Sequence, residues 1–195
     1  MKKIYILYIL TKVYFNTILR VLKNTLIANL WKTKLETKFC APAELKRSNI
    51  TLHKEFSKIF MRYDECKNCV SHCCHSEINR FDFVDCYLNN FVLKEGLSSW
   101  HRISHLMSAG FDLFYSMCRF HQNESPKENC IHFSTSSGCV LPIGNRPWMC
   151  VAGTCYKLLK RFSGDDLRSY SFLLSKFIVF HLKCFFYLLK EVSSC

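Results

Sequence analysis

Apolar and polar side chains alternate near the amino terminus with the spacing of a helix. From Leu10 onward, apolar side chains recur every three or four residues on one face, at Leu10, Tyr14, Ile18, Val21 and Leu22. The other side gathers Lys12, Asn16, Arg20 and Lys23. This pattern predicts an amphipathic helix over residues 1 to about 35. Such a helix can lie on an anionic membrane surface, but its apolar stripe is also what a core-facing helix needs, so we favour packing on the core with a solvated basic face.

Two further helices are predicted by the same periodicity. Pro42 marks a break, and residues 44–63 follow it with an inward face of Leu52, Phe56, Ile59, Phe60 and Tyr63. The carboxyl-terminal helix is expected to begin near Asp165 or Asp166, because carboxylates suit a helix amino terminus. Its apolar run from Tyr170 to Leu189 is interrupted by Lys176, His181 and Lys183. Because a charged side chain at mid-bilayer costs about 3 kcal/mol, a buried or membrane-apposed helix is favoured over a spanning one.

The middle of the chain combines predicted helices with a long irregular stretch. We expect helices at residues 77–92 and 99–119, whereas residues 121–155 are rich in Ser, Asn, Gly and Pro and predict loops and short turns. Irregular backbone of this length usually needs a staple. The predicted fold is mainly α: a small helical domain with irregular loops stapled by a cysteine-ligated metal site. Its parts are basic amphipathic helices at 1–60, the cysteine-cluster domain at 61–160 and an apolar helix at 161–195.

Composition and charge limit the classes of partner that the chain is expected to bind. The 195 residues are 49% hydrophobic with only 6 Gly and 4 Pro, which excludes a wholly disordered chain. The net charge of +12 favours phosphates, anionic lipid head groups or an acidic partner protein. No run of five or more Arg or Lys occurs, and no nucleic-acid-binding motif is present, so specific nucleic-acid binding is not expected.

Thirteen cysteines are several times what an ordinary cytosolic chain carries. A disulfide framework requires export. The run from Ile4 to Leu10 partly imitates a signal peptide, but Lys12 and Arg20 interrupt it and no small-x-small cleavage site follows. We therefore expect a cytoplasmic protein, with membrane association through the terminal helices as an open alternative. In a reducing compartment, clustered thiols are metal-binding or catalytic rather than bridged.

Eight cysteines form a constellation in two segments. Cys66 and Cys69 have the C-x2-C spacing at which two thiolates converge on one ion from a tight turn. The adjacent Cys73 and Cys74 do not easily point at one metal, because successive side chains diverge. The second segment contributes Cys130, Cys139, Cys150 and Cys155. Four thiolates fill a zinc site or one iron-sulfur cluster (4Fe-4S), and eight can serve two metals.

The other cysteines are isolated, and most sit on apolar helical patterns. We assign them to packing or to a loose terminus, since free cysteine behaves as a small hydrophobe; they are Cys40, Cys86, Cys118, Cys184 and Cys195. His72 and His75 flank the adjacent pair and are expected to lie beside the ligands or in solvent, because thiols are already plentiful. Pro147 restricts Arg146, whose charge can either offset a thiolate-ligated centre or pair with a surface carboxylate.

The order C-x2-C-x3-C-C, then Cys130, Gly138-Cys139 and Arg146-Pro147-x2-Cys150 resembles the YkgJ-type cysteine-cluster family, a group of zinc- or iron-chelating domains. The match covers residues 66–155 and differs by one extra residue before Cys73 and by Gly144-Asn145 before Arg146. It implies metal ligation at Cys66, Cys69, Cys73, Cys74, Cys130, Cys139 and Cys150. Cys155 is added from its local chemistry, and Arg146 as a charged neighbour of the metal or cluster.

Three functions remain open on the sequence. The first is a cytoplasmic protein that binds zinc or an iron-sulfur cluster. The second is a cluster-dependent enzyme acting on a protein substrate, since the resemblance extends to flagellin lysine N-methylases. The third is a secreted disulfide-stapled protein. Against an enzyme, the chain has no glycine-rich nucleotide loop, no G-x-S-x-G elbow and no persuasive acid-base pair. Metal binding uses the whole constellation, whereas nucleophilic catalysis uses one thiol, so metal binding is the main prediction.

Overall fold

Helices make up most of the chain that the structure describes. The computed structural model describes residues 2–31, 40–63, 83–89, 133–134, 138–139, 141–152 and 156–194. For these residues the predicted mainly helical class is confirmed.

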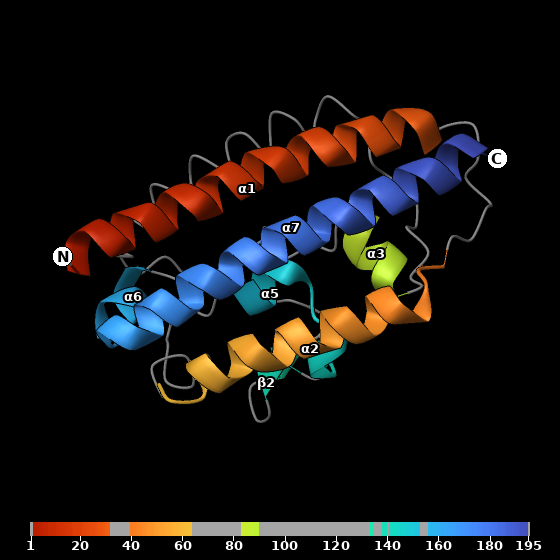
Figure 1. Cartoon of the computed structure of the whole chain (residues 1–195). Helices are drawn as coiled ribbons and strands as arrows, with labels where there is room; N and C mark the ends of the chain where they lie inside the picture. The colour runs from red at the N-terminus through yellow and green to blue at the C-terminus, as the bar shows by residue number, and fades with distance from the viewer. Residues whose placement is uncertain are drawn as a thin grey trace.

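Three long helices lie roughly alongside one another (Figure 1). They are α1 (Lys2–Trp31), α2 (Ala43–Phe60) and α7 (Gly164–Ser194). The last of these packs against both of the others and lies between them. The predictions of a helix near each end of the chain and of one from about residue 44 are confirmed.

Short elements fill the stretch between α2 and α7. They are α3 (Phe83–Asn89), β1 (Phe133–Ser134), β2 (Gly138–Cys139), the 3-10 helix η4 (Ile143–Asn145), α5 (Trp148–Ala152) and α6 (Tyr156–Arg161). The two strands pair antiparallel, with Phe133 opposite Cys139. The helix predicted at 77–92 is confirmed over 83–89, and the one predicted at 99–119 lies outside the described residues. The described part of 121–155 contains only short elements, in line with its loop-like composition.

The start of α7 is fixed by a side-chain cap. Ser163 Oγ accepts a hydrogen bond from the backbone N–H of Asp166 at 3.0 Å, and the Ser163 carbonyl accepts one from Leu167 at 3.0 Å. Serine is a preferred residue at this position because its oxygen satisfies a donor that the first turn leaves open. The helix thus begins within a residue or two of the predicted carboxylates.

Apolar side chains from all three predicted parts of the chain share a core. The largest cluster combines α1, the end of α2, α5, α6 and the first half of α7; its bulkiest members are Phe56, Trp148, Phe162, Tyr170 and Phe177. A second cluster joins the far end of α1 and α7 to α3 and the start of α2, around Ile27, Leu45, Val84 and Leu188. The inward face predicted for α2 is confirmed at Phe56 and Ile59, which are buried, with the other three predicted side chains half-buried.

The predicted orientation of α1 is wrong for most of its stripe, although Leu10 is buried as expected. Arg20 and Lys23 are only 5% and 7% exposed, whereas Ile18 and Leu22 are 41% and 60% exposed. The buried face of α1 instead carries Ile6, Ile9, Leu10, Val13, Asn16, Arg20, Lys23 and Ile27. The reason is that cations of α1 find partners on α5 and α7: the Arg20 guanidinium lies 5.7 Å from the Trp148 ring centre, and at the edge of the buried face Lys12 Nζ donates to Ser175 Oγ at 2.7 Å.

Candidate functional site

Most of the predicted metal ligands lie outside the described residues. These are Cys66, Cys69, Cys73, Cys74, Cys130 and Cys155, together with the flanking His72 and His75. Cys139 belongs to β2 and Cys150 to α5. Within the described ranges, no three His, Cys, Asp or Glu side chains come together as a metal-binding group. The described part of the candidate site is therefore the element from Leu141 to Ala152, which carries Arg146 and Cys150.

The first half of this element is held against α2 by two polar side chains. Asn49 Nδ2 donates to the Gly144 carbonyl at 3.2 Å, and His53 Nδ1 lies 2.6 Å from the Ile143 carbonyl. Because a carbonyl oxygen only accepts, His53 must carry its proton on Nδ1. Gly144 allows the close approach, since a Cβ built there would lie 2.5 Å from Ile50 Cγ1. Glycine, which has no Cβ, therefore fits position 144, whereas a larger residue would displace Ile50.

Burial lowers the pKa of His53, and the positive charge of Arg146 adds to this, although the hydrogen bond to Ile143 acts in the opposite direction. The imidazole is therefore neutral at pH 7, in a site where a charged ring would be poorly solvated.

Arg146 and Pro147 link η4 to α5. Arg146 has φ −72° and ψ 141°, the extended conformation that a following proline imposes. The Arg146 Nε donates to the Leu141 carbonyl at 3.1 Å, which folds the side chain back along its own element. The restriction of Arg146 by Pro147 is thus confirmed, whereas its predicted role beside a metal or cluster stays a prediction.

Trp148 anchors α5 in the centre of the helices. It is 1% exposed, and its backbone N–H donates to Asp85 Oδ1 on α3 at 3.1 Å. Its ring centre lies 6.3 Å from that of Phe177 and 6.4 Å from that of His181 on α7, with Arg20 of α1 on the ring. A single residue two positions before Cys150 therefore contacts α1, α3 and α7.

Cys150 is partly exposed in a turn whose other described side chains are buried. Its neighbours Trp148, Val151 and Ala152 are buried, and its own N–H donates to the Pro147 carbonyl at 2.9 Å. Tyr170 on α7 donates its hydroxyl to the Ala152 carbonyl. The thiol is not part of a disulfide. The backbone on both sides of Cys150 is thus anchored, and its side chain is partly exposed.

The isolated cysteines that the structure describes divide into two cases. Cys184 is buried in α7, as predicted for a packing residue. Cys40 is exposed, so its assignment to packing is wrong: it precedes the break at Pro42, and the adjacent Ala41 is the residue that turns into the core. Cys86 is a residue of α3. Cys118 and Cys195 lie outside the described residues.

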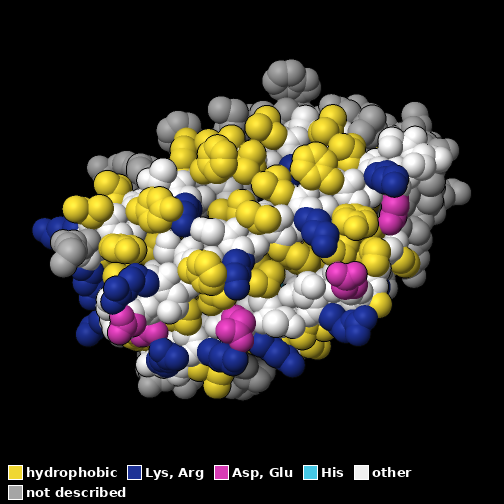
Figure 2. Space-filling view, viewed as in Figure 1, with side chains coloured by type: hydrophobic (Ala, Val, Ile, Leu, Met, Phe, Trp, Pro, Cys, Tyr) yellow, Lys and Arg dark blue, Asp and Glu magenta, His cyan; other side chains and the backbone are white. Residues whose placement is uncertain are grey.

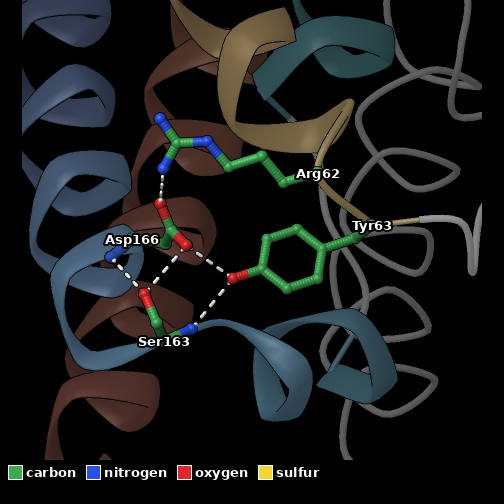
Figure 3. Close-up of polar contacts among 4 residues, drawn as sticks. All are labelled: Arg62, Tyr63, Ser163 and Asp166. Atoms are coloured by element: carbon green, nitrogen blue, oxygen red, sulfur yellow. Dashed lines mark hydrogen bonds and ion pairs between the residues drawn. The ribbon is translucent and has the colours of Figure 1, made fainter.

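Four residues join the end of α2 to the start of α7 (Figure 3). Tyr63 donates its hydroxyl to Asp166 Oδ2 at 2.6 Å and accepts the backbone N–H of Ser163 at 2.9 Å. Ser163 Oγ donates to the same carboxylate oxygen at 2.8 Å, and Arg62 Nη1 lies 2.6 Å from Asp166 Oδ1. The hydrogen bond from Tyr63 is the main cause that lowers the pKa of Asp166, with Ser163 and Arg62 assisting it. We call this group, Arg62, Tyr63, Ser163 and Asp166, the α2–α7 clamp.

Sequence reasoning missed the polar residues that organise these contacts. Asn49 and His53 lie on the buried stripe of α2, in register with Leu45, Phe56 and Ile59. That spacing was the available signal, since a polar side chain on an apolar helical stripe must find a buried partner. Asp85 offered no such signal, because its partner is a backbone N–H more than sixty positions away.

Comparison with known proteins identifies no relative of this chain. No protein-family model matches the sequence, and neither a curated protein nor a solved structure matches it significantly. The resemblance to the YkgJ-type cysteine-cluster family therefore stays a prediction founded on cysteine spacing.

Proposed function

We propose that the chain is a metal-binding protein in which zinc or an iron-sulfur cluster is held by cysteines of the segments 66–74 and 130–155. The observation that supports this proposal is the partial exposure of Cys150 within an anchored turn. A cysteine that serves only as a hydrophobe is expected to be buried like Cys184. A ligand side chain is instead expected to be reachable from a fixed backbone, and the partly exposed Cys150 in its anchored turn fits this expectation.

The α2–α7 clamp supports the proposal because it joins the chain before the first proposed ligand to the chain after the last. Tyr63 stands three residues before Cys66, and Ser163 stands eight residues after Cys155. Contact between Tyr63 and Ser163 therefore fixes together the two ends of the cysteine-bearing part of the chain. A metal that joins the two cysteine segments would close a loop whose ends are already held, and its binding energy would add to the stability of the fold.

The proposed ligands are drawn from Cys66, Cys69, Cys73, Cys74, Cys130, Cys139, Cys150 and Cys155. Four thiolates on one divalent ion leave a net charge of −2 that favours a nearby cation, which is the role proposed for Arg146. Zinc would supply structural cross-linking, and a cluster would add one-electron redox chemistry.

Purification without oxygen, followed by metal analysis and visible absorption, tests the proposal. A brown protein with a broad visible band supports a cluster, and a colourless protein with about one or two zinc ions per chain supports zinc. Cys150→Ser should lower the bound metal, whereas Cys40→Ser, at an exposed cysteine outside the constellation, should leave it unchanged. Metal-free protein with all of its thiols oxidised would overturn the proposal in favour of a disulfide-stapled one.

A further inference from the structure

The outer face of α1 is mostly apolar from Ile4 to Leu26. Its exposed large side chains recur every three or four residues, which places them on one face of the helix; they are Ile4, Tyr5, Leu7, Tyr8, Phe15, Ile18, Leu22 and Leu26. Ile4 is 72% exposed and Leu7 61%. Thr11, on the same face, donates its hydroxyl to the Leu7 carbonyl at 3.0 Å, so that this hydroxyl already has an acceptor within the helix.

The outer face of α7 alternates apolar and basic side chains. Phe172, Val179 and Phe186 repeat every seven residues and are 60%, 66% and 61% exposed. Lysines follow the same seven-residue repeat on the same face, at Lys176, Lys183 and Lys190. Lys176 Nζ lies 4.5 Å from the ring centre of Phe172, and Lys183 Nζ lies 5.9 Å from that of Tyr187. The ammonium groups of Lys176 and Lys183 therefore lie against aromatic rings of the same exposed face.

The two outer faces join across the seam between the helices. Lys12 of α1 reaches Ser171 and Ser175 of α7 at this seam. Hydrophobic side chains are gathered over both helices, with basic groups among them (Figure 2). We call this surface the α1–α7 face. An exposed apolar surface of this extent is typical of a contact site.

Acidic side chains are missing from both helices over most of their length. No Asp or Glu occurs before Glu36, and none occurs between Asp166 and Glu191. The exposed cations on these helices include Lys2 and Lys3 at the start of α1 and the three lysines of α7. The α1–α7 face thus combines apolar side chains with positive charge, which is the chemistry that matches the surface of an anionic bilayer.

We propose that the α1–α7 face binds the surface of membranes that contain anionic phospholipids. The apolar side chains enter the headgroup region, and the lysines, whose long stems allow the charge to remain at the surface, contact the lipid phosphates and carboxylates. This inference does not depend on metal binding by the cysteines.

Two other occupants fit the face less well. A second copy of the chain, packed face to face, would bring lysine rows together without acidic side chains of these helices to pair with them. Both helices are also long and apolar enough to cross a membrane, α1 over Lys2–Ile27 and α7 over Gly164–Ser194, by a criterion that core helices and signal sequences meet as well. A spanning α7 would place Lys176 and Lys183 in hydrocarbon, and its opposite face is already packed on α2 and α3.

Vesicle flotation of the full chain tests the proposal. Vesicles of phosphatidylcholine mixed with phosphatidylserine should bind at least about tenfold more tightly than phosphatidylcholine alone, and salt should weaken the binding. Since each lysine near an anionic surface contributes a factor of about five, the triple change of Lys176, Lys183 and Lys190 to Gln should reduce binding by about a hundredfold. Val179→Ser with Phe186→Ser should reduce binding to both kinds of vesicle.

Matched changes away from the face provide the controls. Lys54→Gln and Met61→Ser alter an exposed lysine and an 80% exposed apolar residue of the α2 region, and should leave binding unchanged. Circular dichroism and thermal unfolding of every variant separate lost binding from lost folding. Equal binding to both kinds of vesicle, or unchanged binding in the lysine variant, would overturn the proposal. So would resistance to alkaline carbonate extraction, which indicates a spanning helix, or a dimer that Val179→Ser with Phe186→Ser dissociates.

Discussion

The phenolic hydroxyl of Tyr63 donates a 2.6 Å hydrogen bond to Oδ2 of Asp166, so that the last described residue after α2 is tied to the first turn of α7. In an ordinary capping box the side chain at Asp166 would reach the backbone N–H of Ser163 directly. Here Tyr63 stands between them, because it accepts from Ser163 and donates to Asp166. The cap of α7 is therefore also a tertiary contact.

Tyr63→Phe removes the hydroxyl that both groups share. The Asp166 carboxylate loses a donor and the Ser163 N–H loses its acceptor, so we expect unfolding to become easier by about 1–3 kcal/mol. Urea denaturation at pH 7 measures this. Arg62→Gln is the matched control: the Arg62 side chain is 62% exposed, and a screened surface pair contributes less than about 1 kcal/mol. A larger effect for Arg62→Gln than for Tyr63→Phe would contradict this account of the clamp.

The contact between Tyr63 and Asp166 also predicts that the stability of the fold changes with pH in the acid range. The pKa of Asp166 is lowered below 3.8 in the fold, so the unfolded chain takes up this proton first as the pH falls. The contribution of Asp166 is therefore complete above pH 3.8 and is lost as the pH falls through the lowered value. Asp166→Asn should show lower stability at pH 7 but a shallower loss between pH 4 and pH 2, measured by urea denaturation across that range. An unchanged slope would show that Asp166 titrates normally.

His53 predicts a second change of stability with pH, at higher pH than the change caused by Asp166. Its pKa is lowered below 6.5 in the fold, chiefly by burial. Above pH 6.5 the ring is neutral in both states and contributes no pH dependence. Below this value the unfolded chain binds the proton first, so stability should fall as the pH drops from 6.5 toward the lowered pKa.

His53→Asn tests this assignment, because the Asn amide can replace Nδ1 as the donor to Ile143 without titrating. The variant should be less stable at pH 7, since it loses the ring packed 5.7 Å from Phe177, but its stability should change less between pH 6.5 and pH 5. The slope of unfolding free energy against pH is the measurement. Equal slopes in both proteins would exclude His53 as its source.

Gly144 and Ile50 predict a coupled pair of substitutions. Gly144→Ala would place a methyl group 2.5 Å from Ile50 Cγ1, an atom close to a stiff β-branched centre, so a loss of about 1–3 kcal/mol is expected. Ile50→Ala removes that atom from a half-exposed position, and Gly144→Ala should cost little in this background. The double-mutant cycle from chemical denaturation gives the coupling. Strictly additive effects would mean that the close approach of η4 to α2 does not limit this site.

The sequence predicted helices better than it predicted their faces. In α2 only one stripe is apolar, so Phe56 and Ile59 were placed correctly. In α1 apolar side chains lie almost all around the helix, and hydropathy alone could not distinguish the face of Ile9 and Val13 from the face of Ile18 and Leu22. Tertiary partners made the choice, because Trp148 accommodates the buried Arg20, and Ser171 and Ser175 bind Lys12 at the edge of the buried face.

The candidate site shows the same limit. Proline chemistry predicted the conformation of Arg146, which depends on its neighbour alone. The anchoring of Trp148 by Asp85 and by α7 could not be predicted, because these contacts join segments far apart in the sequence and leave no periodic signal.

Lys12 gives the last prediction, on the seam between α1 and α7. Its Nζ donates to Ser175 Oγ at 2.7 Å and to Ser171 Oγ at 3.2 Å, and lies 4.2 Å from the ring centre of Tyr8. Lys12→Met keeps the length of the side chain but removes every donor, so we expect a loss of about 1–2 kcal/mol and faster amide exchange in α1 than in α2. Hydrogen exchange resolved by peptide measures this. Lys54→Met, at an exposed position of α2, is the matched control. If α1 and α2 exchange faster by the same factor, Lys12 supports the whole fold and not the seam, because loss of a local contact opens the helix that carries it first.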